Sequence, residues 1–277
     1  MDKKILNYQN KYNNRDVLFL GTGTSLLDHD LNNINPNIII FGFNHIIPFC
    51  QDFWPNLTLD FFMCHDSTVL NMSYHKQQST RDKSESSYGL DLNTPIIHKY
   101  KDISPATFIA DTKLYGRTKI IICSNIKYPH AVRFDMKQNS EWMEENPQIT
   151  SHENFLTYKI KDSPAGELTE LLEVKDDGLN IELWAKNSFL NCVLPMLFFL
   201  GFKNIYLTGV DFSGLGNFFC KTDGSNPMYV DREYKEFQSL MGIANSLPHK
   251  PNIFTLRSDK TKVFGKDGIV DFGVIKK

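Results

Sequence analysis

The stretch from Leu183 to Phe219, LWAKNSFLNCVLPMLFFLGFKNIYLTGVDFSGLGNFF, decides the fold that this sequence predicts. Residues 188–200 are apolar on every side, as in a buried helix, and Gly201 stands where helices commonly end. The segment NIYLT at 204–208 follows as a short strand of the kind that a parallel sheet covers on both faces. A glycine-rich loop, 209–216, then leaves the carboxyl end of that strand, which is the edge where open α/β sheets bind ligands. We expect the remaining segments to add strand-and-helix units around this one.

Composition places the chain among globular proteins. A length of 277 residues with 41% hydrophobic content predicts one large α/β domain. The net charge of −2, without a lysine or arginine stripe, argues against a nucleic-acid partner. Five cysteines with no C-x-x-C spacing indicate reduced thiols. The N-terminus is polar and the longest apolar run is shorter than the ~20 residues that span a bilayer, so we expect a soluble, cytoplasmic protein.

A first buried strand, VLFL at 17–20, runs into Gly21-Thr22-Gly23 and then into Ser25. A strand, a glycine turn and a helix start together place backbone N–H groups and a helix dipole at a phosphate. Ser25 would cap that helix, with Asp28 as its capping-box partner. The alternative is a tight turn that needs glycine only for its backbone angles.

Two positions beyond this turn partly decide which nucleotide could bind. A dinucleotide site would have a third glycine where this chain has Leu26, and an acid at the end of the second strand (37–42), where it has Asn44. These differences argue against NAD, and no P-loop motif is present. Asn44 can bond a base or ribose, and it also suits a turn that needs left-handed geometry.

The third strand, 57–63, ends in Cys64-His65-Asp66, and the fourth, 118–123, ends in Ser124-Asn125. Neighbouring residues of a strand point to opposite sides, so Cys64, His65 and Asp66 cannot converge on one metal ion. We expect Asp66 to cap the next helix and to face the crevice beside Gly23 and Asn44.

The middle of the chain, 137–180, is charged and sprinkled with aromatic residues, which predicts an inserted lid or acceptor-binding segment. An amphipathic helix at 230–246 and a last strand at 252–256 complete the pattern. The predicted fold is therefore a Rossmann-like, mainly parallel sheet flanked by helices, formed by 1–136 and 181–277 with 137–180 inserted.

These segments together resemble the bacterial sialyltransferases of glycosyltransferase family 42, a single-domain variant of the GT-A-like fold. The resemblance lies in VLFLGTGTSLLDHDL, in GFN after the second strand, in TKIIICSN, and above all in NSFLNCVLPMLFFLGFKNIYLTGVDF. Similar segments occur in motility accessory factors and in a related archaeal pterin pyrophosphokinase.

The resemblance implies a CMP-activated sugar that is bound without metal or other cofactor. Residues that would then surround the nucleotide and sugar are Gly21, Thr22, Gly23, Ser25, Asn44, His65, Asp66, Ser124, Asn125, Ser188, Gly209, Asp211 and Ser213.

This chain departs from the family at its catalytic positions. Ser213 and Phe219 stand near the places of two tyrosines that support the leaving phosphate, and Lys186 is the only cation near the place of an arginine. The family's catalytic histidine has no counterpart, so Asp231 or Glu233 would act as the base, with His249 a distant third.

The sequence thus predicts a metal-independent, inverting glycosyltransferase that moves a sialic acid or a relative from a CMP-linked donor to a glycan or glycoconjugate in cell-surface glycan assembly. A binding protein of the same fold, altered in catalysis, and a magnesium-dependent phosphotransferase stay open as alternatives. Peripheral association with the inner face of the membrane and homo-oligomerisation also stay open.

Overall fold

A mainly parallel sheet organises the molecule. The computed structural model describes residues 3–47, 49–71, 73, 89–90, 99–100, 102–125, 137–162, 172–175, 178–183, 188–210, 220–221 and 227–256. Among these residues nine strands form one sheet in the order β11-β9-β1-β2-β3-β5-β6-β8-β7, and all neighbours are parallel except β7 and β8. The strands are β1 (Asp16–Leu20), β2 (Ile39–Phe43), β3 (Phe61–Cys64), β5 (Lys119–Cys123), β6 (Phe155–Asp162), β7 (Leu172–Lys175), β8 (Gly178–Leu183), β9 (Asn204–Thr208) and β11 (Asn252–Thr255). The predicted α/β class is confirmed.

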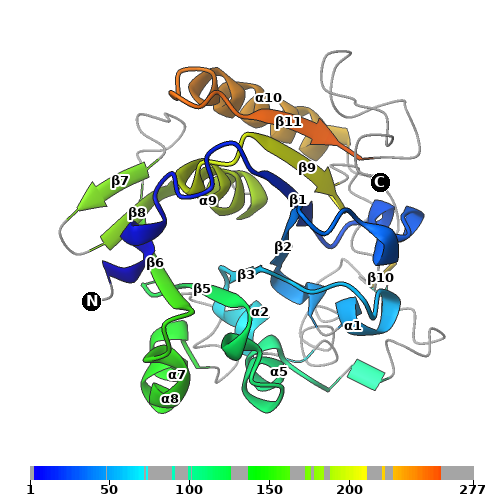
Figure 1. Ribbon diagram of the computed structural model, residues 1–277, viewed down its shortest axis with the longest axis vertical. Coiled ribbons are helices and arrows are strands. Elements are labelled where there is room, and N and C mark those ends of the chain that lie inside the picture. Colours follow the sequence, from blue (N-terminus) through cyan, green and yellow to red (C-terminus); the bar gives the residue numbers. More distant parts are fainter. Residues whose placement is uncertain are drawn as a thin grey trace.

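Helices cover both faces of this sheet, which curves around α9 (Figure 1). One apolar core lies between the strands and α9, and a second lies on the opposite face, beneath residues of α5 and α7. The α-helices are α1 (Phe49–Phe53), α2 (Ser67–Asn71), α5 (Pro105–Asp111), α7 (Asn139–Glu145), α8 (Pro147–Thr150), α9 (Leu194–Leu200) and α10 (Pro227–Ala244). Short 3₁₀ segments are η1 (Lys3–Tyr8), η2 (Thr24–Asp28), η3 (Leu31–Asn33), η4 (Asn44–Ile46) and η5 (Leu114–Gly116), and β4 (Gly89–Leu90) pairs antiparallel with β10 (Cys220–Lys221).

The buried helix at 188–200 begins with a π turn, η6 (Phe189–Val193), and continues as α9. Its cause lies in Pro195, which has no N–H to donate to the carbonyl four residues earlier and whose ring crowds that carbonyl. The N–H of Leu194 donates instead to the Phe189 carbonyl, five residues back. Every residue of η6 and α9 is buried, and the helix ends at Gly201 with φ of 89°, as predicted.

The predicted strands at 17–20, 37–42, 57–63, 118–123, 204–208 and 252–256 are confirmed to within a few residues, and 204–208 matches β9 at both ends. The middle of the chain differs in its detail. Within 137–180, β6 pairs in parallel with β5, so this segment continues the main sheet. A role for it as lid or acceptor-binding element stays a prediction. None of the described helices combines the length and the apolar character that crossing a membrane requires.

Candidate functional site

The strand order reverses at β1, which places a topological switch point between β1 and β9. From β1 the chain adds β2, β3 and β5 on one side, and β9 returns to pair with β1 on the other. Ligands of open α/β sheets bind outside the carboxyl ends of the strands at this point. We call the side of the sheet where β1, β2, β3, β5 and β9 end the carboxyl edge. It is the candidate site.

Two glycines close the switch point. A Cβ placed on Gly21 would lie 2.3 Å from the carbonyl oxygen of Gly209, and one on Gly209 would lie 2.4 Å from that of Gly21. The N–H of Gly21 donates to Thr208 O at 2.8 Å, and the N–H of Gly23 donates to Gly209 O at 2.7 Å. Both amides are therefore used within the protein, which favours the tight-turn interpretation of this loop over a phosphate cradle.

Ser25 has a different role from the predicted helix cap. The segment after the loop is the five-residue 3₁₀ helix η2, whose N-cap is Gly23, and no side chain caps it. The expectation of an α-helix dipole aimed at a phosphate, with Ser25 and Asp28 as a capping box, is wrong. Ser25 Oγ instead accepts a hydrogen bond from the N–H of Gly209 at 3.2 Å and ties the loop to β9. Contact of Gly21, Thr22, Gly23, Ser25 and Gly209 with a ligand stays a prediction.

Asn44 has the backbone geometry of the predicted turn and also an acceptor without a partner. Its φ is 53°, and its Oδ1 is buried without a hydrogen-bond partner. The Oγ1 of Thr208, the last residue of β9, is also buried without a hydrogen-bond partner. Buried polar atoms are nearly always bonded, so these two mark places where a ligand or water fits. Thr208 was not predicted from the sequence, although a hydroxyl that ends an apolar strand is a recognisable signal.

Three other predicted site residues hold the fold together. Asp66 Oδ1 accepts hydrogen bonds from the N–H and hydroxyl of Thr68 at 2.7 and 2.8 Å, so its expected capping role is confirmed. Asn125 bonds the backbone of Ile160 on β6 through both ends of its amide, at 2.7 and 2.8 Å. Ser124 Oγ donates to the carbonyl of Tyr158 at 3.1 Å. Whether any of them also contacts a ligand stays a prediction.

His65 is the most unusual side chain at this edge. It is 4% exposed, and its Nδ1 lies 2.8 Å from the Tyr158 hydroxyl and 3.2 Å from Cys192 Sγ. Burial lowers the pKa of His65 to about 4, and it raises the pKa values of Tyr158 and Cys192 well above their usual range. All three groups are therefore neutral near pH 7. Tyr158 and Cys192 were missed because they lie on β6 and η6, and the sequence does not reveal that these segments pack beside His65.

Asn139, the first residue of α7, joins the ends of β3 and β5. Its Nδ2 donates to the carbonyls of His65 and Cys123 at 3.2 and 2.9 Å, and its N–H donates to Ser67 Oγ at 3.3 Å. The side chain is fully buried and its Oδ1 has no partner. Asn139 was not predicted from the sequence, because it is one polar residue in a charged stretch.

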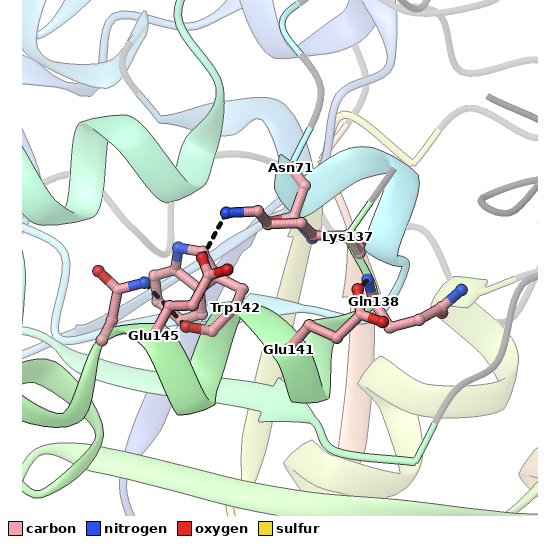
Figure 2. A network of polar contacts seen from close by, with 7 residues as sticks. Asn71, Lys137, Gln138, Glu141, Trp142 and Glu145 are labelled. Atoms are coloured by element: carbon pink, nitrogen blue, oxygen red, sulfur yellow. Dashed lines mark hydrogen bonds and ion pairs between the residues drawn. The ribbon is translucent and has the colours of Figure 1, made fainter. Parts of the chain in front are cut away.

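A network of polar contacts holds the first turn of α7 (Figure 2). Asn139 is the first residue of this helix. The N–H of Gln138 donates to the Glu141 carboxylate at 2.8 Å, and Lys137 forms an ion pair with Glu145. Asn71, at the end of α2, donates to the Lys137 carbonyl at 3.0 Å. Gln138 and Glu141 stand three residues apart, as in a capping box, which is the one sequence signal for this helix start.

The remaining predicted residues are less completely placed. Lys186, Asp211, Ser213 and Phe219 lie outside the described residues. Ser188 precedes η6 and is half-buried. Asp231 and Glu233 lie in α10, which begins at Pro227, so Asp231 is not the cap of this helix. His249 lies beyond α10, and burial lowers its pKa.

Within the described part of the chain, no three His, Cys, Asp or Glu side chains come together as a metal site. Cys64 and His65 follow the expected alternation. Cys64 packs into the core beneath α5, whereas His65 reaches Cys192 of η6 on the other face.

Protein-family models and curated protein sequences give no match to this chain. Among solved structures, the chain is similar to the sialyltransferase CstII from Campylobacter jejuni, solved in complex with a substrate analogue, CMP-3FNeuAc. The two are 14% identical, the match covers 88% of this chain and 82% of that one, and the TM-score is 0.38.

Proposed function

We propose that this protein binds a CMP-activated acidic sugar at the carboxyl edge and transfers the sugar to a glycan or glycoconjugate. The observation that carries the proposal is the topological switch point between β1 and β9, with polar side chains after β2, β3 and β5 along the same edge. The resemblance of the sequence segments that form these same strand ends supports cytidine as the nucleoside and an acidic sugar as the group transferred.

Nucleotide binding is tested first, by thermal unfolding of the full chain with CMP, UMP, GDP, ATP and NAD. A ligand that binds only the folded state raises stability by RT ln(1 + [L]/Kd), about 2.7 kcal/mol at a hundredfold excess over Kd. We expect CMP to give the largest shift. A larger shift with NAD, or no shift with any nucleotide, would contradict the proposal.

Transfer requires a base that takes the proton of the acceptor hydroxyl, and Asp231 is the proposed base. Its position inside α10 removes helix capping as the explanation for an acid there. Replacing Asp231 by asparagine should lower turnover by about 10²–10⁴-fold, with little change in donor affinity. Glu233→Gln is the matched control in the same helix. Turnover that survives in D231N but falls in E233Q would reassign the base to Glu233.

The need for a metal ion distinguishes the proposed glycosyl transfer, which requires none, from a magnesium-dependent phosphotransfer. We expect CMP-sugar affinity and turnover to persist in EDTA. Loss of activity on chelation that magnesium restores, together with pyrophosphate transfer from ATP, would favour a phosphotransferase of the pterin pyrophosphokinase kind.

A second candidate is a nucleotide- or glycan-binding protein of the same fold that performs no transfer. It is favoured by the use of the Gly21 and Gly23 amides within the protein, which removes two donors for a departing phosphate. CMP binding without detectable transfer to any glycan acceptor would select it.

A further inference from the structure

His65, Cys123 and Tyr158 lie in one row across three neighbouring strands. Cys64 of β3 is in register with Ile122 of β5, so the next residue, His65, follows level with Cys123. Cys123 is in register with Tyr158 of β6. The Tyr158 hydroxyl reaches past Cys123 to within 2.8 Å of His65 Nδ1, and η6 brings Cys192 Sγ to 3.2 Å from the same nitrogen.

The hydrogen bonds that His65, Tyr158 and Cys192 can form with one another favour one tautomer of the imidazole. We call these three side chains the trio. If Nδ1 is unprotonated, it accepts from the Tyr158 hydroxyl, and the Cys192 thiol donates to the phenol oxygen or to Nδ1. If Nδ1 carries the proton, the three groups hold three donors and only two acceptors, the phenol oxygen and the weakly accepting sulfur, so one donor has no acceptor among them. The first arrangement uses the better acceptor and satisfies both donors, so the ring proton belongs on Nε2.

The second ring nitrogen is open. Nε2 of His65 makes no hydrogen bond to any described residue. The fully buried side-chain atoms without a partner do not include Nε2. The histidine as a whole is nevertheless only 4% exposed. His65 is the first residue after β3, so this nitrogen is available at the carboxyl edge.

We propose that Tyr158 and Cys192 are positioning residues that hold the proton of His65 on Nε2, and that this N–H donates a hydrogen bond to a phosphate oxygen of the bound nucleotide. The inference rests on the proposed function for the identity of the ligand. Such a donor would stand in for the Gly21 and Gly23 amides, which are already used within the protein. The buried imidazole stays neutral near pH 7, so it acts as a hydrogen-bond donor and not as a cation.

The tautomer is tested in the free protein, without any ligand. Nitrogen-15 NMR of histidine-labelled protein at pH 7 should show His65 protonated on Nε2 and unprotonated on Nδ1. In Tyr158→Phe the tautomers should mix, whereas Cys192→Ser, which keeps a donor at that place, should retain the wild-type signal. A wild-type His65 protonated on Nδ1, or an unchanged tautomer in a folded Y158F, overturns the positioning role.

The ligand contact is tested by calorimetry with CMP and cytidine on the wild type, His65→Gln and His65→Leu. Glutamine presents an amide N–H near the place of Nε2, and leucine presents none. We expect H65L to lose about 10-fold or more in affinity for CMP with little change for cytidine, and H65Q to stay within a few-fold of the wild type.

Two results would count against different claims. Equal CMP affinity in folded H65L and wild type, or an equal loss for cytidine, overturns the phosphate contact and leaves the proposed function standing. Wild-type protein that binds neither CMP nor cytidine overturns the proposed function itself, and the NMR result then stands as a property of the fold.

Discussion

At the level of single residues, the contact between Gly21 and Gly209 is the most sterically demanding feature of the carboxyl edge. An alanine Cβ at position 21 would meet a backbone oxygen, which cannot rotate away as a side chain could. We expect Gly21→Ala to destabilise the protein by about 1–3 kcal/mol or more, as overpacking usually does. Urea unfolding measures this change.

Gly242 provides the matched control for that substitution. It lies inside α10, and a Cβ there would meet nothing within 4 Å. Gly242→Ala should therefore leave stability unchanged or raise it by up to about 1 kcal/mol, because alanine favours a helix interior. If G21A unfolds at the same urea concentration as G242A, the backbone at Gly21 does not lie against the backbone at Gly209.

At the level of elements, the attachment of α7 to β3 and β5 depends on Asn139. Removing its amide leaves the His65 and Cys123 carbonyls without this donor, which should cost roughly 1–3 kcal/mol for each buried group that remains unsatisfied. Asn71→Ala removes an exposed bond to Lys137 O and should change stability by less than about 0.5 kcal/mol. If N139A and N71A have the same free energy of unfolding, the buried hydrogen bonds of Asn139 do not anchor α7.

The elements also show where sequence reasoning works and where it stops. β9 and its helix were predicted because their residues are apolar throughout and Gly201 ends the helix. β6 and β8 were not predicted. In their C-terminal parts, YKIKD and NIEL, apolar residues alternate with polar or charged ones, and both strands lie in a largely polar stretch. Within the candidate site, the strand-end residues were predicted from strand position, whereas the places of Tyr158, Cys192 and Asn139 depend on contacts between segments far apart in the chain, which no local pattern encodes.

At the level of the whole molecule, His65 makes stability depend on pH. Its pKa is about 4 in the folded protein, against about 6.5 when exposed, so between these values the unfolded chain binds the additional proton. His65 does not reduce the free energy of unfolding above about pH 7. As the pH falls toward 4, its titration lowers the free energy of unfolding by roughly 3 kcal/mol in total. Unfolding free energies at pH 7, 6 and 5 should fall less steeply in His65→Gln. Parallel curves for the two proteins would show that the ring titrates normally.

The π turn before Pro195 has a consequence for how this chain can vary. Such a turn is equivalent to one residue inserted into an α-helix, so it rotates the residues before it by about 100° relative to α9. The π turn therefore sets the direction from which the chain at Ser188 enters the helix. Because Pro195 stays after any deletion in η6 and the η6 side chains lie in the core, a chain that loses one residue here should have both its winding and its core packing disturbed.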